Sequence, residues 1–417
     1  MSVSASEPAV LAEPAVLSWR GGFGRLWAAA VVSRFGDGLR GAALPLLATS
    51  LTGSPLLVSL VTAAGFLPWI LFGLLGGAVA DRVDQRRAMR SVDAVRAVLT
   101  GAFALTVALG HASIGLLLAL AFALTTAQTL FDNAATALLP SVVPAAVLGR
   151  ANSRLMTGQT IAGAFVAAPL VAVLLAFSAG APFAVDAATF AAAAALVASL
   201  PAPAGQRPPR PAGRTLRRDI AEGLRALWDD RLLRALCAAN TVANIGVGVL
   251  VATLVLQVTG WLHAGRGGFA AVITAYGVGS VLGGAAAERL TRWLGRARAL
   301  LTGLAVQTCC LVVLGTVRSL AAAVAVMAVF GAFGMVWNVS EVTLLQERTP
   351  AGLLGRVSAA NRTLSVAGAP LGALLGGATA TAWGLNAPPL AAAALFCCAV
   401  GVLIPAVARR DGELSAR

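Results

Sequence analysis

The sequence contains no lysine, only two histidines and one tyrosine, and charged residues fill just 12% of its 417 positions. Soluble domains carry about 25% charged and about 45–50% apolar residues, whereas this chain is 58% hydrophobic, with a mean hydropathy of +0.84. That composition excludes an ordinary soluble domain. Without lysine there is no Gly-x-x-x-x-Gly-Lys phosphate loop, which disfavours an ATP-driven pump. Two histidines are too few for the clustered ligands of a typical metal site.

The cysteines give no sign of disulfides or of a redox pair. None forms a Cys-x-x-Cys pair, and each lies in an apolar run, as a small buried hydrophobic residue does. They are Cys237, Cys309, Cys310, Cys397 and Cys398. No nucleophile, base and acid stand in a pattern typical of an enzyme, so we expect neither catalysis nor a bound cofactor or metal.

Apolar runs recur along the whole chain. A helix needs about 20 apolar residues to cross a bilayer, and the runs reach that length twelve times. The predicted spans are 24–50, 56–80, 88–109, 114–135, 152–177, 182–200, 233–259, 268–289, 297–316, 320–343, 357–382 and 388–407. The sequence therefore predicts an all-α membrane protein with twelve transmembrane helices.

All 31 basic residues are arginines, and the formal net charge is +14. A basic chain can bind nucleic acid, but most of these arginines fall in short loops on one predicted side of the membrane. Those loops carry Arg82, Arg86, Arg87, Arg90, Arg150, Arg154, Arg289, Arg292, Arg296, Arg298, Arg348 and Arg356, whereas the opposite loops carry only Arg266 and Arg318. Because positive residues favour the cytoplasmic side, we expect both termini in the cytoplasm of a bacterial cell, a multi-pass location in its inner membrane, and no nucleic-acid partner.

Two tails and one polar break divide the chain. We predict a cytoplasmic tail over 1–22, a six-helix bundle over 23–200, a linker over 201–232, a second six-helix bundle over 233–408 and a tail over 409–417. The linker begins with a proline- and arginine-rich stretch typical of a stiff, solvated connector. It ends with Leu216, Ile220, Leu224 and Leu227 at helical spacing, which predicts an amphipathic helix along the inner membrane face.

The second half of the sequence repeats the first. G-G-A-V-A-D-R from Gly76 matches G-G-A-A-A-E-R from Gly283, a shift of 207 residues. The segment L-L-P-S-V-V-P-A-A-V-L-G-R ending at Arg150 matches L-L-Q-E-R-T-P-A-G-L-L-G-R ending at Arg356, a shift of 206. Because two separate loop segments recur at nearly the same distance along the chain, the sequence indicates six spans followed by six more in parallel orientation.

The loop after the second predicted span carries a recognisable motif. Its members are Gly77, Asp81, Arg82, Arg86 and Arg87. The pattern Gly-x-x-x-Asp-Arg-x-x-x-Arg-Arg resembles the loop signature of the major facilitator superfamily. In the second copy Gly284, Glu288 and Arg289 stand at the matching places, with Glu in place of Asp and without the double arginine. The resemblance implies the fold of that family, two parallel six-helix repeats.

Two further segments are similar to one branch of the family. F-D-N-A-A-T-A-L-L-P-S-V-V-P at 131–144 and S-R-F-G-D at 33–37 look like the corresponding segments of the exporters of drugs, macrolides and siderophores. The resemblance also implies a latch, in which Asp81 lies near the start of the eleventh helix, expected near Val357, where the helix dipole favours an anion. Asp132 is then a plausible partner for Arg82 or Arg86. The simpler interpretation is that these arginines only set the topology.

Charged residues inside the spans need a reason, because each costs a few kcal/mol in a bilayer. Asp37 lies deepest, with Arg34 and Arg40 three residues away on the same helix face. These three residues are either a proton site in a central cavity or a fixed ion-pair group that never titrates. Asn240 and Asn244, four residues apart, are expected to line the same cavity. Glu341 and Asp186 lie nearer to span ends, where Glu341 is expected to meet headgroups.

We therefore expect a monomeric secondary transporter that exports a small hydrophobic compound in exchange for protons. Uptake or uniport of a small metabolite stays open within the same class. A membrane scaffold or sensor on this fold is the alternative of another class, and it would predict a large additional domain. The partners implied are a small-molecule substrate, protons and the lipid bilayer.

Overall fold

The computed structural model describes residues 19, 21–80, 84–143, 147–200, 216–350 and 353–415, and within these ranges it contains helices but no strand. The first half holds α1 (Gly22–Leu51), α2 (Pro55–Ala80), α3 (Gln85–Ala108), α4 (Ile114–Val142), α5 (Leu148–Thr160), η2 (Ile161–Val166), α6 (Ala167–Phe177) and α7 (Ala181–Ala198). The second half holds α8 (Leu216–Asp229), α9 (Arg231–Leu256), η3 (Gln257–Trp261), α10 (Gly265–Leu294), α11 (Arg296–Thr316), α12 (Leu320–Arg348), α13 (Leu354–Trp383) and α14 (Ala387–Ser415).

Twelve of these helical segments are long enough to cross a membrane. Ten in the described part of the chain are both long and apolar. The eleventh is α1, which has the length but carries Arg34, Asp37 and Arg40 in its middle. The twelfth is the continuous stretch of α5, η2 and α6, which a π-helical turn divides. The twelve predicted spans are therefore confirmed, and only α8 lies outside them.

Several helices extend beyond the predicted apolar runs. α4 continues to Val142, α12 to Arg348 and α14 to Ser415, each past its predicted end at 135, 343 or 407. Hydropathy marks only the part of a helix that suits the bilayer core, whereas the backbone hydrogen bonds continue into the polar interface.

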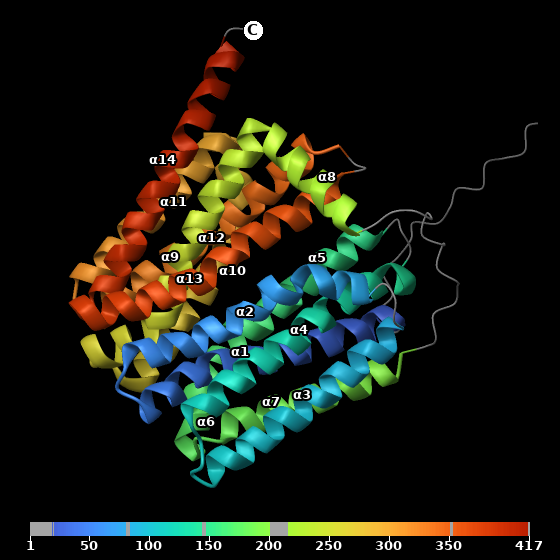
Figure 1. Cartoon of the computed structure of the whole chain (residues 1–417), viewed down its shortest axis with the longest axis vertical. Helices are drawn as coiled ribbons and strands as arrows, with labels where there is room; N and C mark the ends of the chain where they lie inside the picture. The colour runs from blue at the N-terminus through green and yellow to red at the C-terminus, as the bar shows by residue number, and fades with distance from the viewer. Residues whose placement is uncertain are drawn as a thin grey trace, which may run out of the picture.

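The internal repeat is visible in the helix boundaries. α4 begins at Ile114 and α12 at Leu320, while α5 begins at Leu148 and α13 at Leu354. Both pairs are 206 residues apart, the shift found in the sequence. Figure 1 shows the helices from α1 to α7 grouped on one side and those from α8 to α14 on the other. We call these groups the N-half and the C-half.

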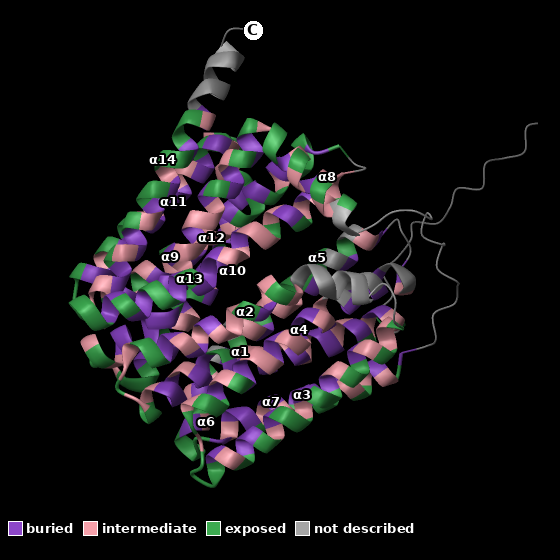
Figure 2. Ribbon diagram, viewed as in Figure 1, coloured by how far each residue is buried: buried purple, intermediate pink, exposed green. Residues whose placement is uncertain are grey.

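The two halves meet along a few helices. α2 packs on α13, and α6 with η2 packs on α10. Small residues bring these helices together, since a Cβ on Gly377 would lie 2.8 Å from Cβ of Ser59, and Ala63 and Ala373 share a buried cluster. Near the other end of the same contact, the Arg362 guanidinium lies over the Trp69 ring, 5.2 Å from its centroid. Figure 2 shows buried residues, drawn in purple, in both the N-half and the C-half.

The predicted amphipathic helix forms as α8. Its apolar face packs against α13 and α9, with Leu227 completely buried. A Cβ on Gly223 would lie only 2.6 Å from the Arg356 carbonyl oxygen, so the glycine permits this close contact. Arg356 also pairs with Glu222 of α8, and Arg348 pairs with Asp230 at 3.0 Å. α8 is therefore fastened to the start of α13, and the end of α12 is paired with the residue that caps α9.

The π turn η2 has a local cause and a packing consequence. Pro169 lies three residues after it, has no N–H for the helix ladder and crowds the carbonyl four residues earlier, which a wider turn relieves. There α1 crosses closely, because a Cβ on Gly38 would lie 2.2 Å from the Gly163 carbonyl oxygen. Glycine at 38 thus brings the charged part of α1 into the interior of the N-half.

Candidate functional site

Five ionisable side chains from three helices form a buried group in the N-half, which we call the inner cluster. Its members are Asp37 and Arg40 of α1, Asp93 and Arg96 of α3, and Asp186 of α7. Their side chains are between 0% and 9% exposed. Gly36 lets α7 approach, because a Cβ at that position would lie 2.2 Å from Asp186 Oδ1.

Asp37 is the shared acceptor of the inner cluster. Its Oδ1 accepts hydrogen bonds from Arg40 Nη2 at 2.6 Å and from Arg96 Nη2. Arg96 also donates to Asp93 Oδ1 at 3.3 Å and to Ser33 Oγ at 3.2 Å. The Arg96 guanidinium lies 3.8 Å from the centroid of the Phe190 ring, a cation–π contact. Such buried charges persist in an apolar interior because each guanidinium is paired.

Asp186 differs from the other carboxylates. Its nearest cation is Arg40, whose Nε lies 3.8 Å from Oδ2, beyond hydrogen-bond distance. Both Asp186 oxygens are buried and accept no hydrogen bond from the residues that the structure describes. Arg40 Nε also has no acceptor there. The contact between Arg40 and Asp186 is therefore electrostatic only.

A more exposed ion pair borders the inner cluster. Arg34 Nη2 lies 3.3 Å from Asp132 Oδ1 of α4, and the two side chains are 31% and 22% exposed. Arg34 Nη1 also reaches Asp37 Oδ2 at 4.0 Å. We call Arg34 and Asp132 the rim pair. Asp132 thus has Arg34 as a partner. Of its two expected partners, Arg82 lies outside the described residues, and Arg86 donates to the Val197 and Ala198 carbonyls at the end of α7.

Sequence reasoning missed Asp93 and Arg96. The signal was present, because they are three residues apart inside a predicted span, with the spacing of Arg34, Asp37 and Arg40. It was overlooked because both residues lie near the start of that span, next to the run of charged residues with which α3 begins.

In the described part of the C-half, Glu341 is the single buried carboxylate, and it is held in a different way. Glu341 of α12 is 7% exposed, which corrects the expectation that it meets headgroups. Its oxygens accept hydrogen bonds from Asn240 Nδ2 at 2.7 and 2.9 Å, from Asn361 Nδ2 at 2.9 Å and from Trp337 Nε1 at 3.1 Å. No cationic side chain in the described residues pairs with it. α12 continues past the predicted end at 343 to Arg348, so Glu341 lies inside the helix rather than at its end, which explains why it is buried.

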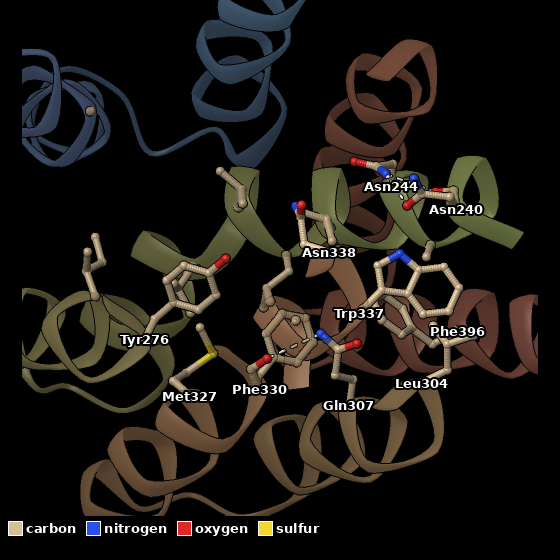
Figure 3. A pocket seen from close by; sticks show the side chains of 18 of the residues that line it. Asn240, Asn244, Tyr276, Leu304, Gln307, Met327, Phe330, Trp337, Asn338 and Phe396 are labelled. Atoms are coloured by element: carbon tan, nitrogen blue, oxygen red, sulfur yellow. Dashed lines mark hydrogen bonds between the residues drawn. The ribbon is translucent and has the colours of Figure 1, made fainter. Parts of the chain in front are cut away.

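A cavity of about 410 Å³ lies beside this group. Its wall comes mainly from the C-half, with Gly41 and Pro45 of α1 contributed by the N-half. Figure 3 shows Tyr276, Met327 and Phe330 together in one part of it, and Asn240, Asn244 and Trp337 in another. Most of the lining is aliphatic or aromatic, and the polar members are mainly amides. Since Asn240 and Trp337 also donate to Glu341, the carboxylate lies one side chain behind the cavity wall.

The predicted single cavity therefore divides into two places. Asn240 and Asn244 line the cavity, and Asn244 Nδ2 donates to Asn240 Oδ1 at 3.0 Å. Asp37 and Arg40 are buried in the inner cluster, and Arg34 belongs to the rim pair. Gly41, the residue after Arg40, reaches the cavity, so α1 connects the two places.

The predicted gating residues are only partly visible. Asp81 and Arg82 lie outside the described residues, and Gly77 belongs to α2. Arg87 Nε lies 3.7 Å from Asp84 Oδ2, and its backbone N–H donates to Asp84, which caps α3. In the second copy a Cβ on Gly284 would lie 3.2 Å from Met335 Cγ, and Glu288 pairs with Arg292 at 3.9 Å rather than with the neighbouring Arg289.

Comparisons with known proteins agree with this architecture. Residues 26–373 match the family described as Major Facilitator Superfamily. The chain is similar to multidrug efflux pump Tap of Mycolicibacterium fortuitum, with 25% identity over 388 residues that cover 87% of this chain and 90% of that protein. Macrolide efflux protein A of Streptococcus pyogenes is 25% identical over 158 residues, which are 38% of each chain. A solved bacterial homologue of the human lysosomal transporter Spinster shares the fold, with a TM-score of 0.75 at 14% identity and coverage of 93% and 96%.

Proposed function

This chain belongs to the Major Facilitator Superfamily, and from that premise we propose that it exports a small hydrophobic compound in exchange for protons. Its family and fold are those of multi-pass membrane transporters rather than of enzymes. Two relatives that bear the names of efflux pumps support the direction of transport. Fold alone does not determine a substrate, so the substrate class has to come from the site.

The observation that carries the proposal is the composition of the cavity wall. A space of about 410 Å³ suits a drug-sized molecule, and pockets of this kind bind mainly through apolar and aromatic contacts. The amides of Asn240, Asn244 and Asn338 offer a few directional hydrogen bonds. A sugar or a polycarboxylate would find too few polar partners there. The proposed substrate is therefore largely apolar, with one or two polar groups.

The proposed proton site is the inner cluster of the N-half. It holds three carboxylates, one on α1 and one each on α3 and α7. α1 also contributes Gly41 and Pro45 to the cavity wall. A small shift of α1 would act on both places, which is the kind of connection that coupled transport needs. A fixed ion-pair group without titration is the competing interpretation.

The domain limits, the orientation and the latch complete the proposal. The N-half over 23–200 and the C-half over 233–408 would rock against each other across the α2–α13 contact, with α8 and both termini in the cytoplasm of a bacterial cell. Gly77, Asp81, Arg82, Arg86 and Arg87 would latch the cytoplasmic ends of the halves, and Gly284, Glu288 and Arg289 would form the weaker second copy. The ionic contacts of α8 with α13 would keep the C-half rigid during this motion.

The test uses inverted membrane vesicles with an acidic interior. Macrolides, other hydrophobic drugs and siderophore-like compounds are added one by one, and a pH-sensitive dye reports the collapse of the proton gradient. Export by proton exchange predicts collapse with at least one compound. Val251→Trp should abolish the response, because Val251 lines the cavity and a larger side chain would fill it.

Val312→Trp is the matched control. Val251 and Val312 are 43% and 42% exposed, but Val312 does not line the cavity. Its variant should respond like the wild type. If Val251→Trp responds normally, the compound does not bind in this cavity. If no compound collapses the gradient, the proposed export is wrong. Uptake or uniport would then be measured with the same compounds in right-side-out vesicles.

A further inference from the structure

The inner cluster contains more carboxylates than guanidinium groups. Among the described residues, Asp37, Asp93 and Asp186 share Arg40 and Arg96 inside the inner cluster, whereas Arg34 pairs with Asp132 at 3.3 Å and lies farther from Asp37, at 4.0 Å. With every group ionised, the five buried side chains would carry one net negative charge. An uncompensated charge in such an interior is costly, and a buried carboxylate relieves the cost by taking up a proton. The geometry therefore calls for one bound proton.

The hydrogen bonds show where that proton belongs. Asp37 accepts from two guanidinium groups, and Asp93 Oδ1 accepts from Arg96. Each of these carboxylates is thus matched to a donor that favours its charged form. Asp186 accepts none from the described residues, although both of its oxygens are completely buried. Its negative charge would be the least compensated of the three.

We infer that Asp186 is the residue that holds the proton of the inner cluster. Its role in transport rests on the proposed proton exchange, but its protonation can be tested without transport. On release, the O–H bond of the carboxyl breaks, the proton passes to water, and the carboxylate left behind needs a partner. Arg40 is placed to provide it, because its Nε lies 3.8 Å away and has no acceptor. Asp186 would then compete with Asp37 for Arg40.

Among the described residues, the charged groups around Asp186 come from the helices packed on α7. α1 presents Arg40 and Asp37, with Arg34 directed to Asp132, and α3 presents Asp93 and Arg96. α6, the third neighbour, has no ionisable residue. The proton affinity of Asp186 therefore depends mainly on where Arg40 lies, which makes Arg40 the positioning residue for the proton.

The first measurement is infrared difference spectroscopy of the purified protein in lipid, recorded against pH without any substrate. The wild type should show the C=O stretch of a protonated carboxyl at neutral pH, and the band should disappear as the pH rises. Asp186→Asn should lack this band. Asp84→Asn, which changes an aspartate at the start of α3 outside the inner cluster, should keep it. A band that persists in Asp186→Asn would overturn the inference.

The second measurement separates Asp186 from Asp93, since removal of either carboxylate would balance the charges. An amide resembles a protonated carboxyl, so Asp186→Asn should melt within about 2 °C of the wild type, whereas Asp93→Asn should melt several degrees lower because Arg96 loses a charged acceptor. The reverse order would assign the proton to Asp93. If Asp186→Asn fails to fold because its amide N–H faces Arg40, Asp186→Leu provides a neutral side chain with the same branching and without a donor. Failure of both variants would show that Asp186 is charged and would overturn the inference.

These results can be told apart from failure of the proposed function. If no compound collapses a proton gradient but the infrared band depends on Asp186, the proton site is real and export in exchange for protons is wrong. If compounds collapse the gradient but the band does not depend on Asp186, the exchange stands and another carboxylate carries the proton.

Discussion

The two halves share a helical plan but hold their buried carboxylates in opposite ways. In the N-half, Asp37 accepts from two guanidinium groups inside a cluster that lies outside the wall of the 410 Å³ cavity. In the C-half, Glu341 accepts only from amide and indole N–H groups, and two of those donors line the cavity. The N-half thus concentrates charge, whereas the C-half surrounds an apolar space with neutral donors.

The internal repeat allows individual residues of the two halves to be compared. Residues 34 and 240 are 206 apart, as are residues 132 and 338, which is also the shift between the starts of α4 and α12. The charged Arg34 and Asp132 therefore correspond to Asn240 and Asn338. Both asparagines line the cavity. One backbone plan thus carries a charged interior in one half and a polar but uncharged one in the other.

The most damaging change should be Asp37→Asn. It replaces the carboxylate that Arg40 and Arg96 share with an uncharged amide, and leaves Arg96 fully buried beside a single carboxylate. Breaking a buried pair costs about 3–5 kcal/mol of the free energy of unfolding. Chemical denaturation in mixed micelles would measure this loss, with the exposed Glu288→Gln as a control that should not change. A loss no larger than that of the control would show that the inner cluster is not held together by Asp37.

Glu341→Gln should have a smaller effect on stability. The new amide N–H₂ would face the donors of Asn240, Asn361 and Trp337, so that at least one buried N–H loses its acceptor, at a cost of about 1–3 kcal/mol. The same denaturation experiment would measure it, with the exposed Glu347→Gln on the same helix as the control. A loss of stability as large as that of Asp37→Asn would contradict the proposed difference in how the two halves hold their buried carboxylates.

Ser365→Ala should have the smallest effect. Ser365 Oγ accepts from Asn240 Nδ2 at 3.1 Å, but that amide also donates to Glu341. Because Asn240 keeps its other acceptor, the loss should be about 0.5–1.5 kcal/mol. Compound binding to the purified variant, followed by tryptophan fluorescence, should stay close to that of the wild type. Complete loss of binding would mean that Ser365 contacts the compound itself.

Much of the fold could be predicted from the sequence. Bilayer-length apolar runs gave the twelve spans, and two loop matches gave the repeat, because both signals are local in the chain. Asn240 and Asn244, expected at the substrate cavity, both line a cavity, since amides four residues apart share a helix face. The partners of charged residues were harder to predict. That Asp132 meets Arg34, and that Asp186 lies beside Arg40, depends on how α1, α4 and α7 cross.

The most direct test of the contrast between the charged N-half and the apolar cavity of the C-half is whether binding of a compound releases a proton. Purified wild-type protein in weakly buffered detergent is titrated with a compound that collapses the vesicle gradient, and binding and pH are recorded together. The account predicts that the wild type releases about one proton per bound molecule. Asp186→Asn should bind without releasing a proton, and Val251→Trp should neither bind nor release. Equal proton release from Asp186→Asn and the wild type would contradict the account, because the proton would then come from outside the inner cluster.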